Sequence, residues 1–388
     1  MSKTQAAVAN PFAELDMGWL RRRSSAKWNY YPEDVLPLWV AEMDAPLASP
    51  ILAVVTEALE NGDTGYPMGQ GYAEAMSSFA SDRWGWSFDS ATTATVPDVM
   101  SGVRETIRAI SADDAAIVVT PPVYPPFFGV AQTLGRTLVN APLDAEDRLD
   151  PATLEAAFKE ATSGGGGAIL LLSNPHNPTG TVHSRAELEM VAELARRYGV
   201  RVVSDEIHAP LIMPSSTLTP YLSVAGTERD FAVSSASKGW NLAGFKAALI
   251  VAGAEAVEDL QLPSLRGAGH AGHIGLIAHT AAYNHARDWL DAAIAGIDAN
   301  RLALADLLET HMPNARYRMP ESTYLAWIDC RDLGLGDDPA VAFLEQGRVA
   351  LTAGTGFGDG GAGYVRFNLA TSPAILEEAV TRMAAVRS

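Results

Sequence analysis

The stretch FAVSSASKGWNLAGFK, residues 231–246, joins a short apolar run to a segment rich in serine and glycine that carries two lysines. An apolar run that gives way to polar residues predicts a buried strand ending in a turn. Two other apolar runs end in the same way, because Asn174 follows AILLLS and Asp205 follows RVVS. Ligands of open α/β sheets bind beyond the carboxyl ends of the strands, so we expect these three polar ends to converge.

The rest of the chain alternates helical patterns with short apolar runs. Segments such as ILAVVTEALENG and ELEMVAELARRYG are separated by runs such as AAIVVT and AILLLS. This alternation predicts an α/β protein with a mostly parallel sheet and helices on both faces. Because 388 residues exceed the usual size of one domain, we expect a large domain at 48–280 and a smaller α+β domain at 281–388. Residues 1–47 are expected to form an arm and part of the small domain.

Composition and charge exclude several classes of protein. The formal charge is −18 and the acidic residues are spread over amphipathic segments, which argues against nucleic-acid binding. No apolar run is long enough to cross a bilayer, and the polar residues after Arg21–Arg23 do not fit a signal peptide. The single cysteine, Cys330, is interpreted as a buried structural thiol. We therefore expect a cytoplasmic protein, without a metal site because the histidines form no ligand cluster.

Lys238 and Asp205 indicate a particular chemistry at the expected strand ends. A lysine that is desolvated at the end of a buried strand can lose its proton and form an imine with an aldehyde. A buried carboxylate such as Asp205 can keep a pyridine nitrogen protonated, which makes the ring an electron sink. The structural alternatives are a surface lysine and a capping aspartate. The loop NPHNPTG, residues 174–180, repeats an Asn-Pro pair that a simple turn does not explain.

With NPHNPTG, SDEIHAP, SSASKGWNLAGFK and GYVRFNLA in this order, the chain resembles the fold-type I pyridoxal-phosphate enzymes of the class I and II aminotransferase family. The resemblance extends over essentially the whole chain. LPLWVAEMDAP, TGYP, PPVYPPFF, AAYNHARDWLD and PESTYLAWIDC are similar to the cystathionine β-lyase, or carbon-sulfur β-lyase, branch of that family. The resemblance implies an aspartate aminotransferase-like fold, pyridoxal 5'-phosphate (PLP) as the cofactor and an amino acid as the substrate.

The resemblance also implies the residues of the site. Lys238 would bind the cofactor as an imine and remove the proton from the substrate Cα, Asp205 would pair with the pyridine nitrogen, and Tyr124 would stack on the ring. Further contacts to cofactor or substrate are implied for Asn177 (ring oxygen and substrate), His208 (ring), Ser235 and Lys246 (phosphate), Tyr66 (phosphate of the neighbouring subunit), Arg366 (substrate α-carboxylate) and Ala41 (substrate). Each has a structural alternative: Tyr124 as a core aromatic, Arg366 as a solvated strand residue, or His208 in a polar niche.

The loop VPDVMSGVRET, residues 96–106, departs from the branch. Lyase relatives usually have glycine in place of Asp98 and proline in place of Ser101. The backbone N–H groups of Ser101 and Gly102, at the start of a helix, are expected to bind the cofactor phosphate. A carboxylate at position 98 is unfavourable beside a phosphate unless it points away. This departure from the lyase branch keeps an aminotransferase activity as the alternative function.

Three functions are compatible with these residues. The branch resemblance implies α,β-elimination of L-cystathionine or a related S-substituted cysteine to a thiol, pyruvate and ammonia. The alternative is an aminotransferase, because the same carbanion can be reprotonated at the cofactor. The third is a regulatory or binding protein that has kept the fold, which the presence of Lys238, Asp205 and Arg366 disfavours. No residue in the sequence plainly recognises the distal end of the substrate.

Two segments imply a homodimer with active sites at the subunit interface. Tyr66 is expected to reach the phosphate of the neighbouring subunit. The glycine-rich segment GAGHAGHIG, residues 267–275, carries His270 and His273 and approaches the partner's site in this family.

Overall fold

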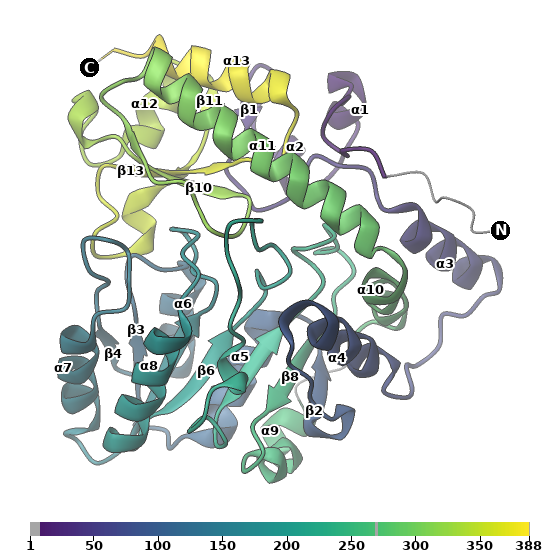
Figure 1. The fold of residues 1–388 in the computed structure, drawn as a ribbon, viewed down its shortest axis with the longest axis vertical. Coiled ribbons are helices and arrows are strands. Elements are labelled where there is room, and N and C mark those ends of the chain that lie inside the picture. The colour runs from purple at the N-terminus through teal and green to yellow at the C-terminus, as the bar shows by residue number, and fades with distance from the viewer. Residues whose placement is uncertain (1–7, 268–270, 388) are drawn as a thin grey trace.

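The computed structural model describes residues 8–267 and 271–387. A seven-stranded sheet occupies the lower half of Figure 1, and a group of smaller sheets lies above it. The strands of the large sheet, in spatial order, are β2 (Thr93–Val96), β8 (Ala248–Ala252), β7 (Phe231–Ser234), β6 (Arg201–Asp205), β5 (Ala168–Ser173), β3 (Ala116–Val119) and β4 (Leu138–Asn140). From β7 to β4 all neighbouring strands are parallel, whereas β8 runs antiparallel to both β2 and β7. The expected mostly parallel sheet is confirmed.

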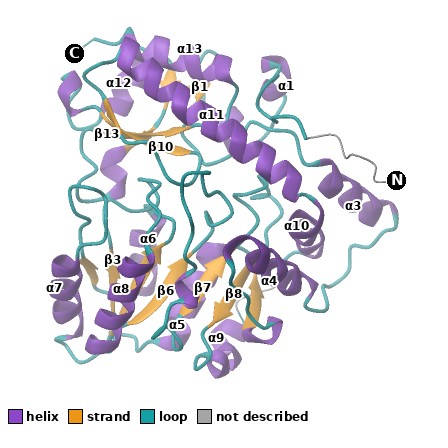
Figure 2. Cartoon of the chain, in the orientation of Figure 1, coloured by secondary structure: helices purple, strands orange, loops and turns teal. Residues whose placement is uncertain are grey.

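Helices accompany this sheet along the chain (Figure 2). They are α3 (Ser49–Glu60), α4 (Gly71–Trp84), α5 (Val99–Ile110), α6 (Pro126–Leu134), α7 (Pro151–Thr162), α8 (Arg185–Tyr198), α9 (Pro263–Arg266) and α10 (His273–His285), with 3-10 turns η1 (Ser90–Thr92), η2 (Tyr221–Ser223) and η3 (Val257–Gln261). α8 shows how local sequence sets these limits. Ser184 and Glu187 form a capping box at its start, and Gly199 ends it with a left-handed φ of 67°.

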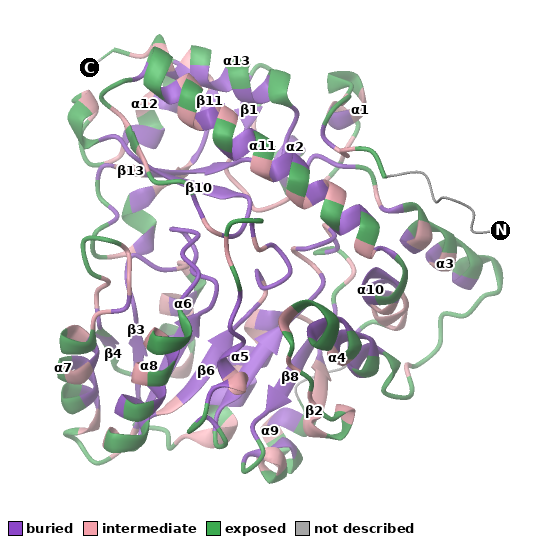
Figure 3. Ribbon diagram, in the orientation of Figure 1, coloured by how far each residue is buried: buried purple, intermediate pink, exposed green. Residues whose placement is uncertain are grey.

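Both faces of the large sheet are covered, because successive strand residues point to opposite sides. In β3, Ile117 and Val119 pack in a cluster with α5 and α6, whereas Ala116 and Val118 pack in a cluster with α7 and α8. Figure 3 shows the central strands largely buried, in contrast to the edge strands β2 and β4, and the outer faces of these helices exposed. Strands that are buried on both faces need apolar residues throughout, which explains their continuous hydrophobic sequence.

The remaining elements form a second, smaller group of sheets. A four-stranded antiparallel sheet contains β12 (Thr352–Ala353), β13 (Tyr364–Asn368), β10 (Leu325–Asp329) and β9 (Arg316–Tyr317), while β1 (Leu36–Pro37) pairs in parallel with β11 (Val349–Ala350). The helices are α1 (Met17–Arg21), α2 (Ala26–Asn29), α11 (Arg287–His311), α12 (Pro339–Glu345) and α13 (Pro373–Ala384), with 3-10 turns η4 (Arg331–Leu333) and η5 (Gly354–Phe357). The pairing of β1 with β11 places the N-terminal segment beside the C-terminal part of the chain.

The predicted domain boundary at residue 280 falls inside α10, which packs against α3 and α4. The division into an arm, a large and a small domain stays a prediction. Within the part of the chain that the structure describes, no helix has both the length and the apolar character needed to span a membrane.

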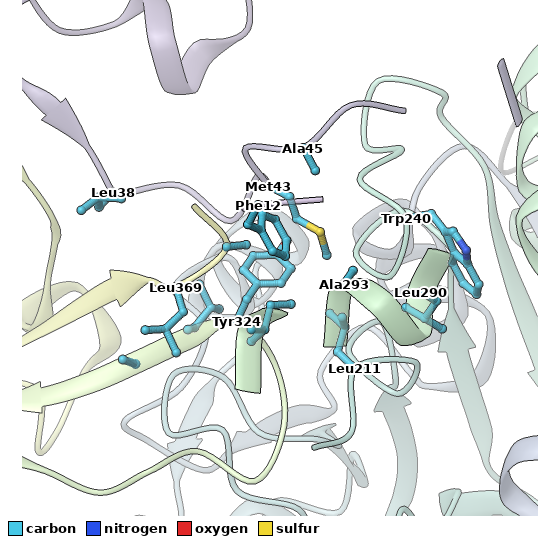
Figure 4. Packing of buried hydrophobic residues seen from close by; sticks show 14 of the residues in the cluster. Phe12, Leu38, Met43, Ala45, Leu211, Trp240, Leu290, Ala293, Tyr324 and Leu369 are labelled. Carbon is cyan, nitrogen blue, oxygen red and sulfur yellow. The ribbon is translucent and has the colours of Figure 1, made fainter. Parts of the chain in front are cut away.

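One hydrophobic cluster connects the N-terminal segment, α3, α4, α10, α11 and the four-stranded sheet. Figure 4 shows ten labelled members of it: Phe12, Leu38, Met43, Ala45, Leu211, Trp240, Leu290, Ala293, Tyr324 and Leu369. Ala236, Trp240 and Leu242 belong to this cluster and flank Lys238. The segment that carries the lysine is therefore anchored by buried neighbours on both sides.

Candidate active site

A cavity of about 480 Å³ lies where the carboxyl ends of β5, β6 and β7 face the four-stranded sheet. Residues expected at the site that line it are Ala41, Tyr124, Asn177, Asp205, His208, Ser235, Lys238, Lys246 and Arg366. Asn174 does not reach the cavity, because its side chain is buried and donates to Glu206 Oε1 and Thr219 O, both at 3.1 Å. Ser173, the last residue of β5, and Asn177, in the loop that follows β5, line the cavity instead of Asn174.

Lys238 follows β7 and extends its amine across the cavity. Its Nζ donates a hydrogen bond of 2.7 Å to the carbonyl oxygen of Ala41. Burial, together with the positive charge of Arg366, lowers the pKa of the amine to about 8, although the carboxylates of Asp205 and Glu42 act in the opposite direction. A substantial fraction of these amines is therefore neutral at mildly alkaline pH.

Asp205 is the last residue of β6 and is buried in the wall of the cavity. One carboxylate oxygen accepts a 3.1 Å hydrogen bond from the N–H of Ile207. Burial raises the pKa of Asp205 to about 7, against the effect of that hydrogen bond and of Lys238. A protonated ring nitrogen beside this carboxylate would offset the cost of its burial, which is the role proposed from the sequence.

Arg366 lies on β13, which brings it to the cavity from the small sheet. Its Nη1 donates to Asn177 Oδ1 at 3.0 Å, and its Nη2 donates to the carbonyl oxygen of Trp39 at 3.3 Å. Its Nε is buried and has no hydrogen-bond partner among the described residues. Burial lowers the pKa of Arg366 to about 10, so the guanidinium stays charged and can receive a carboxylate as a fork.

His208 and Tyr124 supply rings to the cavity wall. His208 Nδ1 is buried without a partner in the described part of the chain, and the ring lies 6.3 Å from that of Tyr324, edge to face. Burial and the nearby charges of Lys238 and Arg366 hold the pKa of His208 well below its ordinary value, so the imidazole is neutral. Burial raises the pKa of Tyr124, whose ring meets Phe127 edge to face at 5.8 Å.

The opposite end of the cavity carries the groups expected to hold a phosphate. Ser235 Oγ donates to the carbonyl oxygen of Ala247 at 2.7 Å and accepts from the N–H of Ser237 at 3.1 Å. Lys246 Nζ lies 3.1 Å from Asp98 Oδ2. Asp98 thus faces the cationic group of this end and does not point away from it.

The first turn of α5 faces the cavity with different residues from those expected. Val99 and Met100 line the cavity, whereas Ser101 and Gly102 do not. The N–H of Ser101 donates to Asp98 Oδ1 at 2.8 Å, and a Cβ at Gly102 would lie only 2.9 Å from Val233 Cγ1. Gly102 is therefore on the side of α5 that packs against the sheet, and the binding of the phosphate by the N–H groups of Ser101 and Gly102 stays a prediction.

Tyr66 lies outside the cavity on the segment between α3 and α4, with 98% of its surface exposed. His270 lies outside the described residues. His273, at the start of α10, places its Nε2 3.0 Å from Asp63 Oδ1. A partner subunit is needed for Tyr66 to contribute to a site.

Trp39, Thr352 and Tyr324 were not among the expected site residues. Trp39 and Thr352 line the cavity, and Thr352 Oγ1 lies 3.4 Å from Arg366 Nη2. Tyr324 is fully buried and donates its hydroxyl to the carbonyl oxygen of Ala41 at 3.0 Å. The motifs LPLWVAEMDAP and PESTYLAWIDC contain Trp39 and Tyr324, so their presence in those motifs was the available signal.

The residues present fit PLP. The cavity combines an amine of lowered pKa, a buried carboxylate and, in Arg366 Nε and His208 Nδ1, buried polar atoms that lack partners among the described residues. The start of the twelve-residue helix α5 and Lys246 supply positive potential at the other end. Fold and site together define the class of PLP-dependent enzymes expected from the sequence.

Comparisons with known proteins identify the family. The model of the family "Aminotransferase class I and II" matches residues 33–383, and the chain belongs to this family. A Mycobacterium leprae protein named "Putative cystathionine beta-lyase" is 51% identical, over 97% of this chain and 98% of its own length. The cystathionine beta-lyase of Corynebacterium glutamicum is 34% identical over 97% and 99%. Cystalysin from Treponema denticola, whose crystal structure contains PLP, superposes with a TM-score of 0.89 at 25% identity, over 97% and 98% of the two chains. The expected family, fold and cofactor are confirmed.

Proposed function

We propose that this chain is a PLP-dependent carbon-sulfur β-lyase, which converts L-cystathionine or a related S-substituted cysteine to a thiol, pyruvate and ammonia. The observation that carries the proposal is the meeting of Lys238, Asp205 and Arg366 in one cavity. The lyase names of relatives at 51% and 34% identity support elimination over transamination.

The residues of the cavity divide the work between binding and proton transfer. Arg366 receives the α-carboxylate of the substrate, and its bond to Asn177 fixes the plane of the guanidinium. Asp205 would keep the ring nitrogen protonated, while Lys246, Ser235 and the first turn of α5 would hold the phosphate. When bound, PLP would supply an electron sink that lowers the cost of negative charge at Cα until the leaving group departs.

Lys238 is the group that moves the proton. Its neutral amine takes the proton from Cα, and the electron pair of that bond forms a Cα–Cβ double bond as the Cβ–S bond breaks. The sulfur leaves as a thiolate with the former C–S pair and is protonated to the thiol. Aminoacrylate, once released, hydrolyses to pyruvate and ammonia. The carbonyl of Ala41 accepts from the Lys238 amine and so sets where that amine starts.

Product analysis of the purified, PLP-loaded protein tests this function. With L-cystathionine and no 2-oxo acid, we expect pyruvate, ammonia and free thiol in equal amounts. Product that forms only when a 2-oxo acid acceptor is supplied would show that the chain is an aminotransferase. Absence of turnover under both conditions would favour a regulatory or binding protein.

We also propose that the chain acts as a homodimer in the cytoplasm, with active sites at the subunit interface. Tyr66 and Met68 are 98% and 99% exposed, on the segment that joins α3 to α4. A second cavity beside them is lined by residues 67–73 and by α10. A partner subunit that packs on this segment would cover both side chains.

A further inference from the structure

Asp98 occupies two of the groups that a phosphate would use at the end of the cavity. Its Oδ1 accepts the N–H of Ser101 at 2.8 Å, and its Oδ2 lies 3.1 Å from Lys246 Nζ. Asp98, Val99 and Lys246 all line the cavity. A carboxylate therefore stands where an incoming phosphate would meet its cation and the first turn of α5.

Asp98 places a negative charge in the cavity, although capping α5 requires only an oxygen that accepts a hydrogen bond. Asp150 caps α7 in the same manner, with its carboxylate accepting the N–H of Ala152 at 2.9 Å, at a place remote from the cavity lining. Burial opposes ionisation of Asp98, but hydrogen bonds from Ser101 and Lys246 outweigh it and lower the pKa of this carboxyl. Asp98 is charged at neutral pH, and its charge points at Lys246.

We propose that Asp98 competes with the phosphate of the cofactor for Lys246 and for the first turn of α5, and so weakens the binding of PLP. The inference rests on the proposed PLP-dependent function. A dianionic phosphate that enters this end must take Lys246 from Asp98 or share it, and the two anions repel each other in both arrangements. Free PLP concentration would then decide how much of the protein is loaded.

The test is a titration of the apo-protein and two variants with PLP and with pyridoxal, followed by absorption and tryptophan fluorescence. Asp98→Asn keeps the helix cap, because asparagine caps as well as aspartate, and removes the charge. Asp150→Asn is the matched control. Pyridoxal carries the same aldehyde and ring without the phosphate, so it reports on everything except the proposed competition.

The expected result is a Kd for PLP about fivefold lower in Asp98→Asn, since exposed ion pairs of this kind contribute up to roughly that factor. The Kd for pyridoxal should stay unchanged, and Asp150→Asn should change neither value. Inorganic phosphate should compete with PLP more strongly in Asp98→Asn than in the wild type.

Three outcomes for Asp98→Asn would overturn the inference. The Kd for PLP could be unchanged, it could be higher than that of the wild type, or the Kd values for PLP and pyridoxal could fall by the same factor. Thermal unfolding of the apo-variant checks that it is folded, and Asp98→Ser, which also keeps a capping oxygen, is the second variant. A wild-type protein that binds neither PLP nor pyridoxal would instead overturn the proposed function, and this inference with it.

Discussion

The amine of Lys238 is held at a defined place before the cofactor binds. It donates to the carbonyl oxygen of Ala41, which also accepts the hydroxyl of Tyr324. Burial lowers the pKa of this amine to about 8, and only the neutral amine can attack an aldehyde or accept the Cα proton. The backbone at Ala41 therefore positions the side chain of Lys238, which lies 197 residues further along the chain.

Replacement of this amine should abolish both cofactor attachment and turnover. We expect Lys238→Ala to lose the visible absorption of the protein-bound cofactor and at least about a hundredfold in the rate of pyruvate formation, because it lacks the catalytic base. Absorption spectra and a pyruvate assay measure the two effects. Lys246→Ala is the control, which should keep the absorption band at saturating PLP. Turnover retained in Lys238→Ala would contradict the mechanism.

Asp205 should make the apo-protein less stable as the pH rises. Its folded-state pKa of about 7 exceeds that of an unfolded aspartate, so the folded state binds the proton more tightly and loses this advantage between about pH 4 and 7. Asp205→Asn cannot ionise. Its free energy of unfolding relative to the wild type should therefore rise by about 1–3 kcal/mol from pH 5 to pH 8.

Urea denaturation of both apo-proteins at the two pH values measures this difference. Binding of PLP should remove this pH dependence. A protonated ring nitrogen stabilises the carboxylate of Asp205 in the wild type, and it does not stabilise the amide of the Asp205→Asn variant in this way. A difference that is the same at pH 5 and pH 8 would show that Asp205 is already ionised in the folded apo-protein.

The residues that sequence could place are those fixed by local patterns. Lys238 and Asp205 follow apolar runs whose ends are visible in the sequence, and parallel pairing brings such ends together. The sequence did not predict that Val99 and Met100, rather than Ser101 and Gly102, would line the cavity. Which side of α5 faces the cavity depends on its contact with Val233, a residue far along the chain.

At the scale of elements, α5 places its N-terminus in the cavity because it packs closely on the sheet. A Cβ at Gly102 would lie 2.9 Å from Val233 Cγ1 and 3.0 Å from Val96 Cγ2. A larger side chain there must push the helix away from the strands. The first turn, with Val99 and Met100, would move with it.

We expect Gly102→Leu to lower the free energy of unfolding of the apo-protein by about 1–3 kcal/mol and to weaken PLP binding as well. Gly129→Ala in α6 is the control, because a Cβ there meets nothing within 4 Å and should instead stabilise the protein by about 0.5–1 kcal/mol. Thermal and chemical denaturation measure both changes. Gly102→Leu with wild-type stability would mean that α5 can shift freely.

Strands that are buried on both faces could be predicted from their continuous apolar sequence. Strands whose limits depend on pairing with distant segments were harder to predict. β5, β6 and β7 are continuous apolar runs, and they are strands as expected. β8, an equally short apolar run, was not among the expected strands, and it runs antiparallel to both of its neighbours. β1 ends at Pro37, and beyond it the carbonyls of Trp39 and Ala41 accept from Arg366 and Lys238.

At the scale of the whole molecule, the exposed Tyr66 makes the oligomeric state testable. We expect light scattering to give twice the 41.1 kDa of the chain. Tyr66→Ala and Lys238→Ala subunits, refolded together, should form hybrids in which one site has both Lys238 and the partner's Tyr66. Activity of the mixture above that of either variant alone is the expected result. A fully active monomer would contradict the proposal.

The wall of the cavity also joins the two ends of the chain. Asn368 Nδ2 donates to the carbonyl oxygen of Val40 at 2.8 Å, and Arg366 Nη2 reaches Trp39 across 327 residues of sequence. On the ribosome the N-terminal segment emerges long before these two partners are made, and domains begin to fold from the N-terminus. The carbonyls of Trp39 and Val40 thus gain these two partners only when translation is nearly finished. A nascent chain interrupted before β13 already contains Asp205, Lys238 and Lys246 but lacks Arg366, the group proposed to receive the substrate carboxylate.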